Sequence, residues 1–158
     1  MNNTPRNIIV HHSAATAPTP QFDAINDWHK ARGFPLSELG FYVGYHYVIE
    51  QNGQLRTARF EHEIGAHTIG QNDKSIGICL VGNFDKTEPT AQQVATLGDM
   101  LTSLCLRYRL DEDNIHPHRA YKATSCYGAK LRNYWAAFVY LEHEITRLRL
   151  RQDNLPTD

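Results

Sequence analysis

The sequence has few cysteines, almost no net charge and no long apolar run. Its three cysteines are an odd number, and in a chain without a visible secretory leader they argue against a disulfide framework. The net charge of -1 gives no broad basic surface, so we expect no binding to nucleic acid. No stretch approaches the ~18 apolar residues of a membrane-spanning helix. With these classes excluded, the composition is that of an ordinary globular protein.

Nothing in the sequence divides the chain. It has no internal repeat, low-complexity tract or linker rich in proline or serine, and its 158 residues can bury a substantial core. We therefore expect residues 1–158 to form one domain. The first six residues lack the apolar core of a signal peptide, which predicts synthesis in the cytoplasm.

Strand and helix patterns alternate along the chain. Three apolar segments predict strands: residues 7–11, 41–51 and 75–81. Helices are predicted from Thr19-Pro20, from the Thr90 capping box and over about residues 128–151. Strands interleaved with three helices predict an α/β fold, in which helices flank a central mixed sheet.

The last predicted helix, over about residues 128–151, has an apolar stripe and a basic end. The residues expected to face the core are Leu131, Tyr134, Trp135, Phe138, Leu141, Ile145 and Leu148. Arg147, Arg149 and Arg151 follow, where cations interact favourably with the helix dipole. The alternative interpretation is weak contact with an anionic membrane surface.

Two segments carry residue types that bind metals. The run from His118 to Cys126 sets an imidazole and a thiol eight positions apart, and the hydroxyl of Thr124 lies two residues before the thiol. A second segment ends in His11 and His12 after an apolar run. Two histidines and a cysteine, with a fourth position open to water, form the ligand set of a catalytic zinc ion. The hypothesis is a zinc hydrolase.

The residues alone leave the choice of histidines open. Alternate side chains of a strand point to opposite faces, so His11 and His12 cannot both face one metal ion. By the same alternation His116 and His118 point to the same side, and His116 is the nearest rival ligand. Cys79 and Cys105 lie in apolar stretches, where we expect buried thiols.

Five segments, in this order, resemble the zinc-dependent N-acetylmuramoyl-L-alanine amidases, a family shared by phage endolysins and animal peptidoglycan recognition proteins. The segments are Val10–Ser13, Gly44–Tyr47, Ala66–His67, Ser75–Gly82 and His118–Cys126. The resemblance covers roughly residues 7–140, and it is greatest to the phage endolysins.

The resemblance implies a central mixed sheet with a zinc site in a surface groove that receives the stem peptide of peptidoglycan. It implies that His11, His118 and Cys126 bind Zn²⁺ and that Tyr45 and Thr124 are the catalytic pair beside the metal. The implied reaction is hydrolysis of the amide between N-acetylmuramic acid and L-alanine. A phenol can stabilise the oxyanion, but a threonine hydroxyl is a poor general base, so the base stays open.

Two positions depart from the family's usual pattern. Phage members often have lysine where this chain has Thr124, which is like the recognition proteins. Proline usually follows the ligand cysteine, whereas this chain has Tyr127. We expect that tyrosine to change the backbone path or to shape one groove wall. His116 is then expected to support the metal site or line the groove.

Several further residues are expected near the groove. A loop histidine among small residues, His67, is expected to contact the substrate, and Arg59 and Asn83 are expected to line the groove beside it. Glu61 and Glu63 are expected to be solvated.

The resemblance implies an endolysin that cuts the sugar–peptide amide of bacterial peptidoglycan during host lysis. Such an enzyme is made in the host cytoplasm without a signal peptide and acts in the periplasm after the membrane is permeabilised. We expect a monomer. Two alternatives are a cytosolic amidase that recycles muropeptides and a non-catalytic module that binds peptidoglycan. Thr124 does not match the recycling branch, and Cys126 argues against a non-catalytic module.

Overall fold

The structure, a computed structural model, describes residues 2–17 and 20–154. Its centre is a five-stranded sheet in the order β3-β2-β4-β1-β5. The strands are β1 (Asn7–His12), β2 (Tyr47–Ile49), β3 (Leu55–Thr57), β4 (Ser75–Leu80) and β5 (Ile115–Pro117). β1, β2, β4 and β5 are parallel, and β3 pairs antiparallel with β2. The predicted mixed sheet is confirmed.

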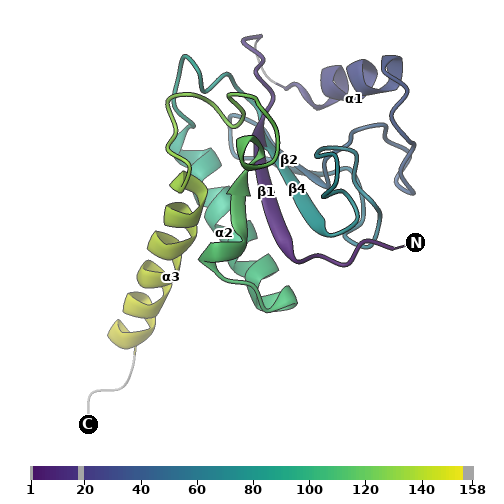
Figure 1. Cartoon of the computed structure of the whole chain (residues 1–158). Helices are drawn as coiled ribbons and strands as arrows, with labels where there is room; N and C mark the ends of the chain where they lie inside the picture. Colours follow the sequence, from purple (N-terminus) through teal and green to yellow (C-terminus); the bar gives the residue numbers. More distant parts are fainter. Residues whose placement is uncertain (1, 18–19, 155–158) are drawn as a thin grey trace.

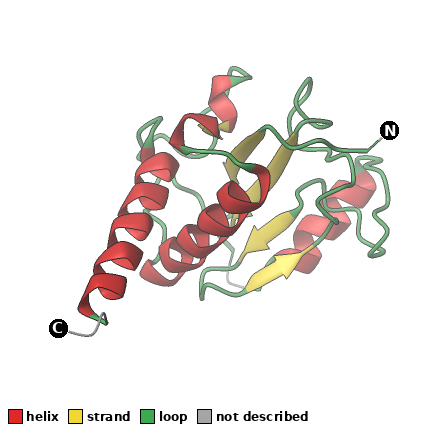
Figure 2. Cartoon of the chain, turned by 90° about the horizontal axis from the view of Figure 1, so that it is seen from below, coloured by secondary structure: helices red, strands yellow, loops and turns green. Residues whose placement is uncertain are grey.

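Helices cover both faces of the sheet. They are α1 (Phe22–Ala31), α2 (Ala91–Tyr108) and α3 (Trp135–Asp153), and two short 3₁₀ helices, η1 (Glu112–Asn114) and η2 (His118–Ala120), flank β5. Figures 1 and 2 show α2 and α3 on one side of the sheet and α1 on the other. Thr19, where the first helix was expected to begin, lies outside the described residues. Among the described helices, none has both the length and the apolar character needed to cross a bilayer.

The sheet separates two apolar cores because its side chains alternate. Ile8 and Val10 of β1 pack with the buried leucines of α2. On the opposite face, Cys79 of β4 packs with Phe22 of α1. His11 is paired in register with Cys79, so it lies on the α1 face.

The start of α2 has the predicted capping box. The hydroxyl of Thr90 accepts from the backbone N–H of Gln93, and the Gln93 side chain accepts from the backbone N–H of Thr90, both at 3.1 Å. Leu97, Leu101 and Leu104, which recur at helical spacing along α2, are buried. The amphipathic pattern therefore located this helix correctly.

The prediction for α3 is wrong in two respects. The helix begins at Trp135 rather than near residue 128, and residues 128–134 form turns. Tyr134, Phe138, Ile145 and Leu148 were expected in the core, yet they are 49–72% exposed. The face that packs inward instead carries the small residues Ala136, Ala137 and Val139. A close approach to α2 needs small side chains, so the larger stripe points away from the core.

Candidate metal and catalytic site

Three candidate metal ligands meet at the carboxyl end of the central strands. His11 is the penultimate residue of β1, His118 opens η2 directly after β5, and Cys126 lies in the loop that follows. β1 and β5 are parallel neighbours, with Val10 opposite Pro117. Residues that end or follow these strands therefore meet at one edge of the sheet, where ligands of α/β proteins usually bind.

The three side chains have the spacing of a metal site. Their ligand atoms all lie within 4.8 Å of one another. Nδ1 of His11 is 3.8 Å from Sγ of Cys126, and the rings of His11 and His118 have centroids 4.5 Å apart. A tetrahedral zinc ion, bonded at about 2.0–2.3 Å, sets its ligand atoms about 3.3–3.8 Å apart. The donor set and its spacing fit zinc with one position left for water.

Burial keeps the imidazoles of this group neutral. Burial and then the neighbouring His67 and His118 hold the pKa of His11 well below its usual value, and burial also lowers the pKa of His118. Burial raises the pKa of the Cys126 thiol to about 11. Neutral imidazoles are ready to bind a metal ion, and the thiol would release its proton when it does.

The two rival histidines lie outside this group. Nδ1 of His12 accepts a hydrogen bond from the backbone N–H of Phe84 at 3.0 Å. His116 packs edge-on against Tyr121 and lines a separate depression. The expectation that His116 faces the groove is wrong, because η2 begins at His118 and ends the alternation of the strand.

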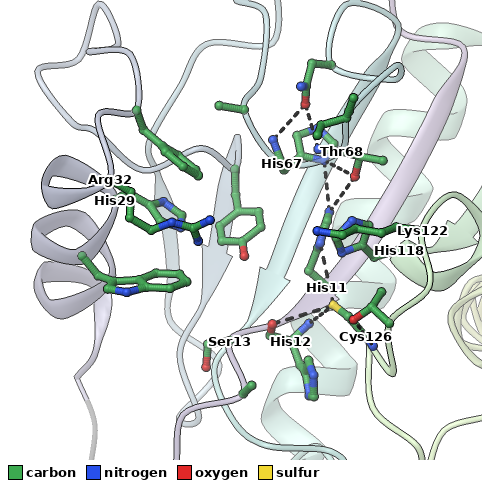
Figure 3. A pocket seen from close by; sticks show the side chains of 18 of the residues that line it. His11, His12, Ser13, His29, Arg32, His67, Thr68, His118, Lys122 and Cys126 are labelled. Carbon is green, nitrogen blue, oxygen red and sulfur yellow. Dashed lines mark hydrogen bonds between the residues drawn. The ribbon is translucent and has the colours of Figure 1, made fainter.

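A cavity of about 540 Å³ opens over the three candidate ligands. The α1 side contributes Trp28, His29, Arg32, Phe34 and Tyr45, and the loop after η2 contributes Lys122, Thr124 and Ser125. Figure 3 shows Arg32 and Lys122 on opposite sides of His11. A positively charged side chain therefore stands on each side of the candidate ligand His11.

Tyr45 and Thr124 both border the cavity. The ring of Tyr45 lies 5.0 Å from that of His11. Burial raises the pKa of Tyr45 well above its usual value, so the phenol keeps its proton and can donate it in a hydrogen bond. The hydroxyl of Thr124 accepts from the backbone N–H of Cys126 at 3.3 Å.

The three residues expected to contact substrate have different positions. His67 borders the cavity but is only 9% exposed, and it contacts His11. Arg59 is buried, and its Nε donates to the carbonyl of Val43 at 2.8 Å. The side chain of Asn83 accepts from the backbone N–H of Asp85 in a turn. The prediction that Arg59 and Asn83 line the groove is wrong, because both are engaged in holding main-chain segments.

The α1 wall was not predicted from the sequence. Trp28 and His29 lie in α1, and both border the cavity. Trp28 is 56% exposed, and the guanidinium of Arg32 lies 4.6 Å from the centre of its ring. His29 is buried, stacks on Phe34 at 4.2 Å, and accepts from the N–H of Gly44. Trp28 and Arg32 lie four residues apart, about one helical turn, so their side chains are neighbours on a helix. This spacing is the feature of the sequence that could have predicted their contact.

Tyr127 does not shape the groove wall. The peptide bond that precedes it is cis, and its side chain is buried. The hydroxyl donates toward the carbonyls of Arg132 and Asn133, at 2.9 and 2.7 Å, and the ring meets Trp135 edge-on at 5.7 Å. Tyr127 therefore packs the loop after Cys126 onto the start of α3.

Comparison with known proteins gives consistent matches. Residues 1–129 match the Amidase_2 family model, described as N-acetylmuramoyl-L-alanine amidase. The endolysin of Escherichia phage T7 is 32% identical over 131 residues, which are 78% of this chain and 82% of that protein. Peptidoglycan-recognition protein SC2 of Drosophila melanogaster is 26% identical over 127 residues, covering 79% and 69%.

Solved structures give the same picture. The N-acetylmuramoyl-L-alanine amidase LysC from Clostridium intestinale superposes with a TM-score of 0.75 at 28% identity, over 90% of this chain and 87% of that one. A mutant of Drosophila PGRP-LB in complex with tracheal cytotoxin gives a TM-score of 0.69 at 27% identity, over 83% and 79%. The expected fold is confirmed.

Proposed function

Because this chain belongs to the N-acetylmuramoyl-L-alanine amidase family, we propose that it cleaves the amide between N-acetylmuramic acid and L-alanine of peptidoglycan in the cavity over His11, His118 and Cys126. The observation that carries the proposal is the spacing of these ligand atoms, all within 4.8 Å of one another, with Tyr45 beside them. Peptidoglycan amidase activity agrees with the similarity to phage endolysins.

The metal is proposed to be Zn²⁺, held by His11, His118 and Cys126. Two imidazoles and a thiolate are soft to borderline ligands that suit zinc better than magnesium or calcium, which prefer oxygen. When bound, zinc supplies Lewis acidity and lowers the pKa of a water molecule toward ~7.

Tyr45 and Thr124 are proposed to act on the reacting amide. The phenol of Tyr45 keeps its proton, so it can donate a hydrogen bond to the carbonyl oxygen as negative charge develops there. The hydroxyl of Thr124 already accepts from the N–H of Cys126, which leaves its own proton for the substrate or for water. Thr124 positions the reactants rather than removing a proton, since a hydroxyl is a weak base near pH 7.

The walls of the cavity are proposed to bind the stem peptide. This peptide carries carboxylates, and Arg32 and Lys122 present positive charges on opposite sides of the metal position. Trp28 offers an exposed aromatic surface that the Arg32 guanidinium holds in place. His67 can touch the substrate only through the small part of its ring that reaches the cavity.

We propose that the protein acts as an endolysin. It would be made in the host cytoplasm and would reach the wall in the periplasm after the membrane is permeabilised. Its relatives in phages T7 and T3 are endolysins. One chain supplies every residue of the proposed site, so residues 1–158 are proposed to work as a single catalytic domain and as a monomer.

A weak contact with anionic membranes is also proposed, through the outer face of α3. Phe138, Ile145 and Leu148 are exposed there, and Arg149 and Arg151 are exposed close by. Apolar side chains bordered by cations are typical of helices that bind to lipid surfaces.

Digestion of purified Gram-negative sacculi tests the amidase proposal. The products are analysed by mass spectrometry, with and without a chelator, and the Cys126→Ser variant is the control. We expect free stem peptides that begin at L-alanine, lost on chelation and restored by zinc. Release only from small anhydro-muropeptides would favour the recycling enzyme, and binding without any cleavage would favour the non-catalytic module.

A further inference from the structure

His67 is enclosed by two segments that each present a glycine to its ring. A β-carbon on Gly77 would lie 2.6 Å from Cγ and Cδ2 of His67, and one on Gly65 would lie 2.6 Å from Cδ2. Any other residue at either position would displace the imidazole. The backbone is fixed as well, since Oδ1 of Asn72 accepts from the N–H groups of His67 and Thr68, both at 2.8 Å. The fold therefore holds this ring in one place.

The ring of His67 contacts His11. Nδ1 of His67 lies 3.0 Å from Nε2 of His11, and the two rings are perpendicular with centroids 5.1 Å apart. Figure 3 shows His67 and Cys126 on opposite sides of the His11 ring. The Thr68 hydroxyl lies 3.5 Å from the same Nε2 and offers a second, longer acceptor.

The two nitrogens of His11 consequently have different partners. Nδ1 faces Sγ of Cys126 at 3.8 Å, so it is the nitrogen available to a metal, and the ring proton then resides on Nε2. In that tautomer the N–H would donate to Nδ1 of His67, which also lies 3.1 Å from the Thr68 hydroxyl, and a His67 proton on Nε2 would face the Ser75 hydroxyl at 3.4 Å. The Ser75 hydroxyl in turn donates to the carbonyl of Gln71 at 2.7 Å. Every proton in this series has an acceptor.

We propose that His67 is a positioning residue for His11. It accepts the Nε2 proton, which fixes the tautomer of His11 and leaves Nδ1 free toward the metal. The Ser75 hydroxyl orients His67 in the same way. This inference rests on the proposed metal site and assigns His67 a role other than substrate contact. Partners of this kind orient the ligand ring and raise its basicity.

Two substitutions of His67 test the proposal. His67→Leu removes the acceptor and keeps an apolar side chain, whereas His67→Asn places an amide oxygen near the position of Nδ1. His46→Leu is the matched control: the His46 ring packs edge-on against His67 at 5.8 Å, but its nitrogens bond to backbone groups of Gly77 and Glu63 rather than to His11. The zinc dissociation constant is measured by competition with a chromogenic chelator. The tautomer of His11 is read by long-range ¹H–¹⁵N NMR, with and without zinc.

We expect His67→Leu to weaken zinc binding by about 10- to 100-fold and to remove the preference of His11 for the Nε2–H tautomer. His67→Asn should restore most of the affinity, and His46→Leu should leave it unchanged. Wild-type affinity and tautomer in His67→Leu would overturn the proposal, as would equal losses in the Leu and Asn variants.

Two further measurements keep the test decisive. If His67→Leu does not fold, Ser75→Ala replaces it, since this change removes the acceptor of the His67 proton. A smaller loss of zinc affinity is then expected, and unchanged affinity and tautomer would contradict the proposal. A wild-type protein that binds no zinc would overturn the proposed metal site, while the tautomer of His11 in the metal-free protein would still report on His67.

Discussion

Nδ1 of His11 lies 3.8 Å from Sγ of Cys126, although the two residues are 115 positions apart in the chain. Parallel pairing of β1 with β5 closes most of that separation, and η2 with its following loop closes the rest. The sheet and the loop after η2 therefore bring together side chains that are far apart in the sequence.

Replacement of Cys126 by serine should abolish zinc retention and amidase activity. The hydroxyl has a much higher pKa than the thiol and is a poor zinc ligand, so two histidines would remain. Metal content by mass spectrometry and peptide release from sacculi are the measurements. Cys105→Ser, a buried thiol in α2 away from the cavity, is the control and should keep its zinc. Full activity in metal-free Cys126→Ser would refute the assignment of this ligand.

Replacement of Tyr45 by phenylalanine should slow hydrolysis by about 100-fold or more while zinc stays bound. The change removes one hydrogen-bond donor to the developing oxyanion and keeps the ring that packs beside His11. Turnover on a soluble muropeptide and zinc content are measured together. Unaltered turnover would show that Tyr45 is only a packing residue.

Replacement of Arg32 by alanine should raise KM more than it lowers kcat. The guanidinium borders the cavity and lies 4.6 Å from the ring centre of Trp28, and we propose that it binds carboxylates of the stem peptide rather than the reacting amide. Lys30→Ala removes an exposed cation of the same helix that does not border the cavity and serves as the control. Equal KM values for the two variants would argue against a role of Arg32 in substrate binding.

The sequence predicted which three side chains come together as candidate ligands better than it predicted the cavity walls. His11, His118 and Cys126 lie in short motifs whose order the family resemblance could align; His11 lies near the end of β1, and His118 follows β5. Arg59 and Asn83 were misplaced because a polar side chain near a groove can equally bond to the main chain, as both do here. The contribution of α1 to the cavity wall could not be predicted from the sequence, since the position of a helix over a cavity depends on tertiary packing.

Glu61 illustrates the same difficulty for charged residues. It was expected to be solvated, but its carboxylate accepts hydrogen bonds from the hydroxyls of Tyr47 and Tyr108, at 2.6 and 2.5 Å, and from Arg107. Burial raises the pKa of Glu61, but these three donors together outweigh burial, and the net pKa is below 4.5. Three donors from two distant segments cannot be read from the residues around Glu61.

Replacement of Glu61 by glutamine should therefore destabilise the protein in a pH-dependent way. A depressed pKa in the folded state contributes stability above the unfolded-state value near 4.5, and that contribution disappears as the pH falls through the lower folded value. Hydrogen bonds to a charged group typically contribute about 1.5–3 kcal/mol, so the free energy of unfolding at pH 7 should fall by about that amount. Urea unfolding from pH 7 to pH 3 measures the difference, which should shrink on acidification. The exposed Glu88→Gln is the control, and a pH-independent difference would contradict the explanation.

The outer face of α3 is where helical periodicity misled most. Phe138, Ile145 and Leu148 recur at core spacing, but the helix meets α2 through smaller residues on its other face. Apolar spacing reports which residues share a face and not what covers that face. The exposed stripe and its neighbouring arginines are the basis of the proposed membrane contact.

Charge reversal at Arg149 and Arg151 should weaken binding to anionic vesicles by about 30-fold or more, since each cation near such a surface contributes about 1 kcal/mol. Co-sedimentation with vesicles of phosphatidylglycerol and phosphatidylcholine is the measurement, at low and at high salt. The control reverses the exposed Lys30 and Lys86, which changes the net charge equally but leaves α3 intact. Binding should be lost with the α3 variant, persist with the control and weaken with salt for both the wild type and the control. Equal loss in the two variants would mean that net charge alone drives the attraction, and no binding by the wild type would remove the membrane contact altogether.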